Sequence, residues 1–267
     1  MPIEIQPHEA GIAYQMKQAD LISPILPLLK SGAMYIDANG KIKIPISGAE
    51  PQTPWIHPRC DQSKDCGLWH AIMFDHYGFI PSPCFECWKI VVSPRTLKEL
   101  WQLLELQEEK WDGPCKCGIE VRDITPRLYG GYFYNNSLDE GQENYRKVRQ
   151  LVDENISPDI PIILKRACTE FEMRFGPSNN WQLQPGQLDK EEAIVNMFDR
   201  EDEPSWEQVA EVRPRVMRAW IQWAYKHGDL TYLEFNGGQT LYPETVKYHE
   251  LDLSTLKTTT MEVVRRQ

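Results

Sequence analysis

The alternation of apolar and polar positions is most regular between about residues 87 and 175. Trp88 to Val92 (WKIVV) predicts a buried strand. Ser93-Pro94 is expected to cap a helix from about Arg95 to Lys110, in which leucines recur at helical spacing. This stretch therefore opens with a strand followed by an amphipathic helix.

The same region continues with two further strands, expected at residues 118–122 and 129–134. Ser137 then precedes a helix that we expect to run to about Asn155. A fourth strand is expected at residues 161–165, with a continuation through residues 169–172. The order β-α-β-β-α-β is that of the split unit of the ferredoxin-like fold. We therefore expect an α+β protein with a ferredoxin-like central unit at about residues 87–175.

The flanking regions show separate patterns. An Asn39-Gly40 turn predicts a hairpin between Met34 and Ile44, and a proline-rich link follows it. Beyond residue 187 helices are expected at 188–198, from near Ser205, and at 215–227, before a hairpin at 232–242. The expected division is an N-terminal segment (1–58), a cysteine-rich core (59–180), an acidic helical and hairpin region (187–256) and a polar tail (257–267).

The cysteines give the clearest indication of chemistry. Six of the seven fall into three close pairs, which are Cys60 with Cys66, Cys84 with Cys87, and Cys115 with Cys117. Cys-x2-Cys lets two thiolates bind one metal ion from a single turn, and a second pair completes a tetrahedron. The strands after the second and third pairs are expected to be parallel, so these two pairs enter the sheet at one edge. We therefore predict a metal site formed by Cys84, Cys87, Cys115 and Cys117.

Cys60 and Cys66 are expected to form a second or alternative site, with His57, His70 or His76 as further candidate ligands. A structural zinc ion is the preferred occupant, because four thiolates suit it. An iron–sulfur cluster is the alternative, although the spacing differs from that of bacterial ferredoxins. A disulfide framework ranks last. Cys168 lies outside the group and is interpreted as a buried small hydrophobe.

Composition bears on location and partners. The chain has 267 residues, 41% of them hydrophobic, and a formal net charge of −10. That charge disfavours nucleic acid and anionic membranes as partners. No apolar run reaches the roughly 18 residues that a membrane-spanning helix needs. The N-terminus has no signal-peptide pattern, so we expect a cytoplasmic protein with reduced thiols.

Three functions follow from these patterns. The preferred one is a zinc-stabilised binding or assembly module whose partner is another protein. The first alternative is an iron–sulfur redox protein or enzyme, with Arg166, Glu170 or the group His70, Asp75 and His76 near its substrate. The second alternative is nucleic-acid binding through the tyrosine-rich strand at 129–134 or the C-terminal hairpin. The sequence contains no recognised phosphate-binding loop, nucleophile elbow or zinc-protease motif, so it leaves open whether the protein is an enzyme.

Overall fold

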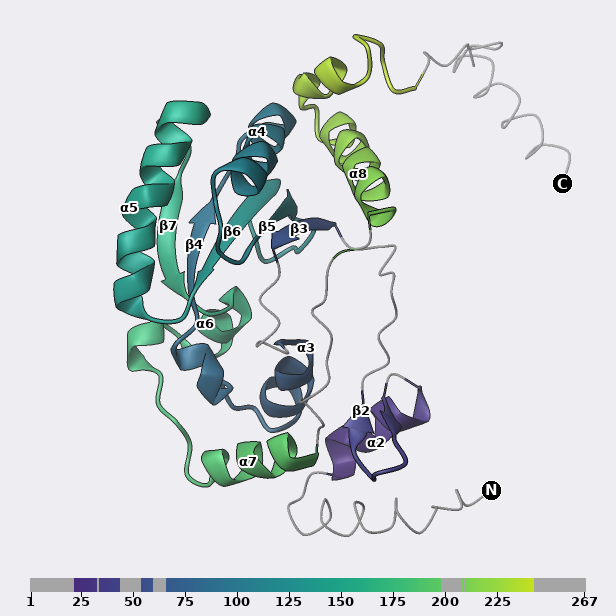
Figure 1. Cartoon of the computed structure of the whole chain (residues 1–267), viewed down its shortest axis with the longest axis vertical. Coiled ribbons are helices and arrows are strands. Elements are labelled where there is room, and N and C mark those ends of the chain that lie inside the picture. The colour runs from purple at the N-terminus through teal and green to yellow at the C-terminus, as the bar shows by residue number, and fades with distance from the viewer. Residues whose placement is uncertain are drawn as a thin grey trace, which may run out of the picture. The chain divides into compact units, whose positions relative to one another are not determined.

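The computed structural model describes residues 22–32, 34–43, 54–59, 66–197, 208 and 210–242. The chain divides into two compact units, Met1–Tyr232 and Leu233–Gln267. Every element of the candidate site lies in the first unit. That unit is of mixed α+β type and contains a five-stranded antiparallel sheet (Figure 1).

The sheet has the spatial order β3-β5-β6-β4-β7. Along the chain, helix α4 (Leu97–Glu109) connects β4 to β5, and helix α5 (Leu138–Asn155) connects β6 to β7. β4 and β5 are both antiparallel to β6, so they are parallel to each other. The strand bounds are β3 Trp55–Arg59, β4 Trp88–Val92, β5 Cys115–Ile119, β6 Tyr129–Asn135 and β7 Ile162–Arg166.

Both crossover helices begin at a side-chain cap. The Ser137 hydroxyl accepts a hydrogen bond from the Glu140 amide at 3.2 Å, as the sequence predicts for α5. At α4 the cap is Thr96, which accepts from the Glu99 amide at 3.2 Å, and not the Ser93-Pro94 pair. Each cap satisfies an amide that the first turn of a helix leaves without a partner.

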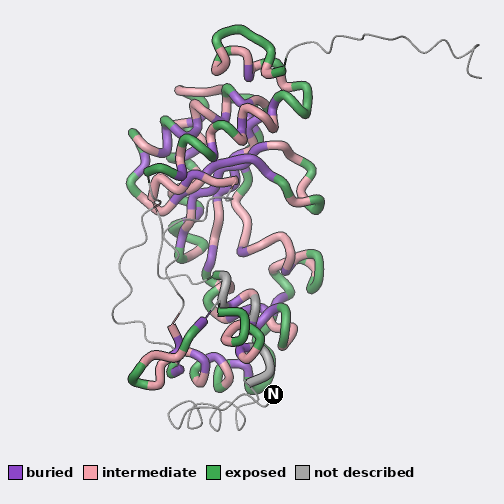
Figure 2. Tube along the Cα trace, turned by 90° about the vertical axis from the view of Figure 1, so that its right-hand side faces the viewer, coloured by how far each residue is buried: buried purple, intermediate pink, exposed green. Residues whose placement is uncertain are grey.

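Helices α4 and α5 pack against the same face of the sheet, which we call the helix face. Gly131 on β6 lies so close to α4 that a Cβ there would come within 2.3 Å of Leu103. Gly141 of α5 lies over Trp88 and Leu164. The residues between the helices and the strands are buried, as the tube in Figure 2 shows, and include Ile90, Val92, Leu97, Leu100, Leu103, Phe133, Val148 and Val152. This apolar layer is the main core.

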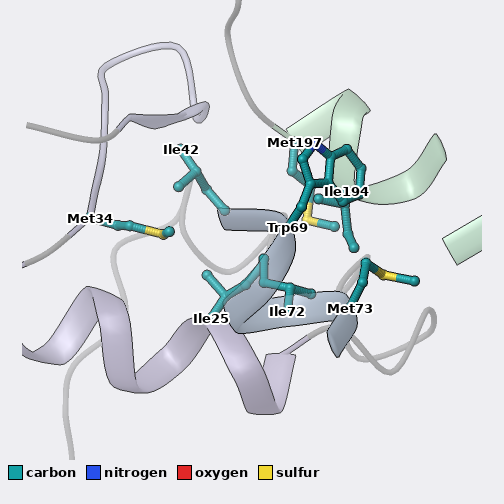
Figure 3. Close-up of a cluster of buried hydrophobic side chains, with 8 residues drawn as sticks. All are labelled: Ile25, Met34, Ile42, Trp69, Ile72, Met73, Ile194 and Met197. Atoms are coloured by element: carbon teal, nitrogen blue, oxygen red, sulfur yellow. The ribbon is translucent and has the colours of Figure 1, made fainter. Parts of the chain in front are cut away.

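A second group of buried side chains forms a core of its own (Figure 3). It joins helix α2 (Ile22–Lys30), the short hairpin of β1 (Tyr35–Ile36) and β2 (Ile42–Lys43), the π-helix η1 (His70–His76) and helix α7 (Gln187–Met197). The π-helix directly follows the one-turn helix α3 (Cys66–Trp69). The buried side chains of this core are Ile25, Met34, Ile42, Trp69, Ile72, Met73, Ile194 and Met197. This packing fixes η1, which carries a residue of the candidate site.

Two expectations from the sequence are wrong. The fourth strand does not continue through residues 169–172, because helix α6 (Thr169–Phe175) begins there and buries Phe171. The C-terminal hairpin is absent from the described residues up to Tyr242, and its expected first strand is the 3-10 helix η4 (Leu230–Phe235). The Asp229 carboxylate accepts from the amide and hydroxyl of Thr231, which favours a helical turn there.

Strand β3 was missed because its residues, WIHPR, lie within the proline-rich link. The remaining elements are η2 (Ser82–Phe85), η3 (Ser178–Asn180) and α8 (Val212–Lys226). The helix expected from near Ser205 and the tail at 257–267 lie outside the described residues.

Candidate active site

The sheet face opposite α4 and α5 carries lysines and tyrosines, and we call it the lysine face. Side chains alternate along a strand, so residues paired across neighbouring strands share a face. Lys89 of β4 pairs with Tyr134 of β6, and Lys116 of β5 pairs with Tyr132. The Lys89 ammonium lies 5.6 Å from the centroid of the Tyr134 ring. A charged group placed on a packed sheet is costly unless it has a partner.

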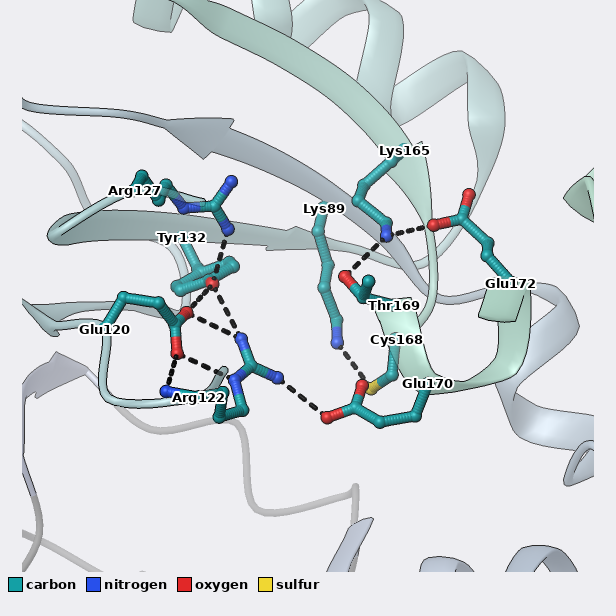
Figure 4. Close-up of polar contacts among 10 residues, drawn as sticks. All are labelled: Lys89, Glu120, Arg122, Arg127, Tyr132, Lys165, Cys168, Thr169, Glu170 and Glu172. Carbon is teal, nitrogen blue, oxygen red and sulfur yellow. Dashed lines mark hydrogen bonds and ion pairs between the residues drawn. The ribbon is translucent and has the colours of Figure 1, made fainter. Parts of the chain in front are cut away.

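Cys168 supplies that partner for Lys89. The Lys89 Nζ donates to the Cys168 Sγ at 3.0 Å (Figure 4). The contact depends on a sharp turn between β7 and α6, where Ala167 has a φ of 46°. This left-handed conformation costs roughly 1–2 kcal/mol for a residue with a side chain. The Ala167 amide donates to the Cys87 carbonyl at 2.7 Å, and the turn brings Cys168 back to the lysine face.

His70 is the second partner of Cys168. Its ring stacks on Phe171, with the centroids 4.8 Å apart, and it hydrogen-bonds to the Cys168 sulfur. This hydrogen bond raises the pKa of His70 against the opposing effect of burial. His70 begins the π-helix η1, a widened helical turn that recurs at functional sites.

These contacts favour the thiolate form of Cys168. Burial alone raises the pKa of Cys168, but the charge of Lys89 and the hydrogen bonds from His70 and Lys89 outweigh it and lower the pKa to about 6. Burial likewise acts to lower the pKa of Lys89, and the negative charge of Cys168 holds it well above its usual value. At neutral pH the site therefore contains a thiolate beside an ammonium group, and the raised pKa of His70 favours its protonated form.

Two carboxylates and an arginine border the thiolate. Arg122 lies 2.7 Å from the buried carboxylate of Glu120 and 2.9 Å from Oε1 of Glu170. The other oxygen of Glu170, Oε2, is buried and has no hydrogen-bond partner among the described residues. The charge of Glu170 contributes to the raised pKa of His70. The charges of Glu170 and Cys168 thus both favour the protonated form of His70.

Lys116 lies further along the same face. Its ammonium is 4.9 Å from the centroid of the Trp55 ring and 5.6 Å from that of Tyr132. Burial, followed by the charge of Lys89, lowers the pKa of Lys116 to about 8. Burial and the charge of Lys116 lower the pKa of His57 to about 3, so that this histidine is neutral.

The predicted metal ligands separate into two groups. Cys84 and Cys87 lie near Cys66 and Cys168, since burial and the charges of these three cysteines raise the pKa of Cys84. Cys115 and Cys117 are buried in β5 on the helix face, pointing away from that group.

Alternation along the strand explains this separation. β4 and β5 are parallel, as expected. Along β5, however, Lys116 lies on the lysine face, so its neighbours Cys115 and Cys117 lie on the helix face. Cys60 lies outside the described residues. Among the residues that the structure describes, no group of three or more His, Cys, Asp or Glu side chains is placed to hold a metal ion. The zinc and iron–sulfur expectations stay predictions.

The sequence analysis missed the role of Cys168, which is partly exposed and hydrogen-bonded and is not a buried hydrophobe. One usable signal was the lysine within the apolar run Trp88 to Val92, because a charge in a central strand requires a partner. His76, by contrast, is exposed and packs its ring edge-on against Tyr77.

Comparisons with protein-family models, with curated proteins and with solved structures give no match for this chain. Within the described part of the chain, none of the helices combines the length and the apolar character needed to cross a membrane.

Proposed function

We propose that this protein is a cysteine-dependent enzyme in which Cys168 is the nucleophile. The observation that carries the proposal is the position of the Cys168 sulfur, 3.0 Å from the Lys89 ammonium and hydrogen-bonded to His70. A thiolate beside a cation and a histidine is the arrangement that activates nucleophilic cysteines. The strained turn at Ala167 supports the proposal, because strained backbone clusters at functional sites.

The reaction class that fits these groups is acyl transfer to water. The Cys168 thiolate attacks an acyl carbon, and the carbonyl electron pair moves to the oxygen, which the Lys89 ammonium stabilises. The tetrahedral intermediate collapses to a thioester as protonated His70 donates its proton to the leaving group. Neutral His70 then takes a proton from water, which attacks the thioester and releases the acid and the thiolate. The negative charge of Glu170 stabilises His70 whenever its imidazole ring is protonated.

A chromogenic ester tests this proposal on the full chain. With p-nitrophenyl acetate, we expect a rapid release of one equivalent of nitrophenol and an acetyl group on the peptide that contains Cys168. Slower turnover follows as water hydrolyses the thioester. Acetylation confined to lysines, or an equal burst in Cys168→Ser, would contradict the assignment.

The strand arrangement supports a finer description of the fold. The chain order β4-α4-β5-β6-α5-β7 and the spatial order β5-β6-β4-β7 agree with the split unit of the ferredoxin-like fold, to which β3 adds a fifth strand. On that description the unit leaves the lysine face free of its two crossover helices. The candidate site occupies this face.

A second candidate function is the zinc-stabilised module that binds a protein partner. The specific observation in its favour is that the charges of Cys66 and Cys87 both act to raise the pKa of Cys84, although these thiols are not placed to hold an ion among the described residues. Elemental analysis and a visible spectrum of protein purified without oxygen test it. About one zinc per chain, lost in Cys84→Ser, supports this candidate. Iron with acid-labile sulfide supports the iron–sulfur alternative instead, and metal-free folded protein rejects both.

A further inference from the structure

Tyr132 is the centre of a basic and aromatic cluster on the lysine face. The Lys116 ammonium lies 5.6 Å from the centroid of its ring, and the Arg127 guanidinium carbon lies 5.7 Å from it. The Trp55 ring meets Tyr132 edge-on at a centroid distance of 5.4 Å. The Tyr132 hydroxyl accepts a hydrogen bond from Arg127 at 2.9 Å. Two cations are thus held around one aromatic ring.

The other cations of this face have anionic partners. Lys89 pairs with the Cys168 thiolate, Lys165 with Glu172, and Arg122 with Glu120 and Glu170. Lys116 and Arg127 contact no carboxylate among the described residues, and the Arg127 Nε is buried with no hydrogen-bond partner there. The carboxylate nearest to Arg127 in this network is that of Glu120, which accepts from the Tyr132 hydroxyl at 3.1 Å and does not contact the arginine itself.

Two glycines let neighbouring groups approach the backbone beside these cations, and at Gly118 the Pro54 carbonyl and Trp55 take up that space. Gly130 of β6 pairs with Gly118 of β5, so neither strand places a side chain on the lysine face at this level. The Arg127 Nε lies 3.4 Å from the position that a Cβ on Gly130 would occupy, which places the guanidinium over the bare backbone. The buried Arg127 Nε is a donor that Tyr132 does not use, because the tyrosine hydroxyl accepts from Nη2.

We infer that Lys116 and Arg127 bind an oxyanion of the ligand, a phosphate or a carboxylate. Arginine presents donors in a planar fork that suits both oxyanions, and lysine adds a compact positive charge. Lys116 lies close enough to Cys168 to respond to its charge. If Cys168 is the nucleophile, which is the proposed function, this oxyanion site positions an anionic substrate for its attack.

Thermal unfolding of the full chain tests the oxyanion site, because a ligand that binds the native state raises the unfolding midpoint. Sodium phosphate and sodium acetate are each compared with sodium chloride at equal ionic strength, which removes general screening. We expect a saturable rise with phosphate, with acetate, or with both. Phosphate alone indicates a phosphate-bearing ligand, and acetate alone indicates a carboxylate.

Variants locate the effect. We expect Lys116→Met and Arg127→Gln each to weaken the apparent anion affinity by about tenfold or more. Lys147→Met is the matched control, since Lys147 is exposed on α5 and paired with Glu143, and it should leave the affinity unchanged. Phosphorus-31 line broadening measures phosphate binding directly should a variant unfold too early for the thermal assay. No excess stabilisation over chloride, or anion binding that survives both substitutions, overturns the inference.

The same measurement in Cys168→Ser separates this inference from the proposed function. Anion binding that persists in Cys168→Ser, in a protein whose Cys168 does not react with p-nitrophenyl acetate, supports the oxyanion site and rejects the nucleophile. A reactive Cys168 without anion binding rejects the oxyanion site alone.

Discussion

The two faces of the central sheet are built from the same strands and differ in nearly every chemical property. On the helix face, side chains such as Ile90 and Phe133 are fully buried, and the thiols of Cys115 and Cys117 are buried there too. On the lysine face, Lys89 and Lys116 occupy the positions next to those residues. Adjacent residues of one strand thus serve stability and chemistry separately, and the two roles should be separable by mutation.

The largest expected difference concerns the cysteines. Cys168→Ser should reduce acylation by p-nitrophenyl acetate at least about 10³-fold, because the alkoxide of serine is scarcely populated at neutral pH. Cys117→Ala on the helix face should leave the acylation rate unchanged and lower the free energy of unfolding by about 1 kcal/mol. Burst kinetics and denaturant unfolding measure the two effects. Equal loss of acylation in both variants would remove the distinction between the faces.

Neighbouring residues of β4 allow a second comparison. Lys89→Met should raise the pKa of Cys168, since burial is then opposed by His70 alone, and slow its alkylation at pH 7 by about tenfold or more. Ile90→Ala should lower the free energy of unfolding by about 2–5 kcal/mol through loss of a fully buried side chain. While Ile90→Ala remains folded, its Cys168 should react at the normal rate. Unchanged alkylation in Lys89→Met would contradict the assigned ion pair.

The adjacent glycines of β6 sharpen the comparison in stability alone. An alanine at position 131 would place its Cβ 2.3 Å from Leu103, so Gly131→Ala should cost about 1–3 kcal/mol. At position 130 the nearest atom would be 3.4 Å away, and Gly130→Ala should change stability by less than about 0.5 kcal/mol. Urea unfolding of the two variants measures this difference. Equal costs would show that the packing on the two faces is alike.

The last effect is a pH dependence of stability. The pKa of Cys168 is lowered to about 6 in the folded chain, so its thiolate stabilises the fold above the unfolded value of about 8.5, and this is lost as the pH falls toward 6. The raised pKa of His70 has the opposite effect, because the stability that protonated His70 contributes is lost as the pH rises above about 6.5. The free energy of unfolding of the wild type minus that of Cys168→Ser should therefore rise with pH, by less than about 1.4 kcal/mol per pH unit. A flat difference curve would contradict the lowered pKa.

Much of the fold could be predicted from local sequence. The strand at Trp88 to Val92, the Ser137 cap and the Asn39-Gly40 turn all carry short-range signals, and the structure has each of them. The break between β7 and α6 could not be predicted, because the residues after it include Phe171 and Thr169, which also suit a strand. Phe171 packs edge-on against Phe74, and this tertiary contact favours the helix over a strand.

The site was less predictable than the fold. Cys84 and Cys87 were expected to lie with Cys115 and Cys117, but the thiols whose charges act on Cys84 include Cys66 and Cys168. A shift of one residue in the strand register moves every side chain to the opposite face of the sheet. Whether Lys116 or Cys117 faces the helices therefore depends on the strand pairing, which the spacing of the cysteines in the sequence does not reveal. His70 and Cys168 meet only through the packing of η1 on α6.

The central claim is that the lysine face holds a thiolate at Cys168, and the pH dependence of its alkylation tests this most directly. The full chain is treated with limiting iodoacetamide from pH 5 to 10, and the modified Cys168 peptide is quantified by mass spectrometry. The account predicts a half-maximal rate near pH 6 in the wild type, shifted upward in Lys89→Met. A half-maximal rate near the ordinary thiol value of about 8.5, unaffected by that substitution, would contradict it.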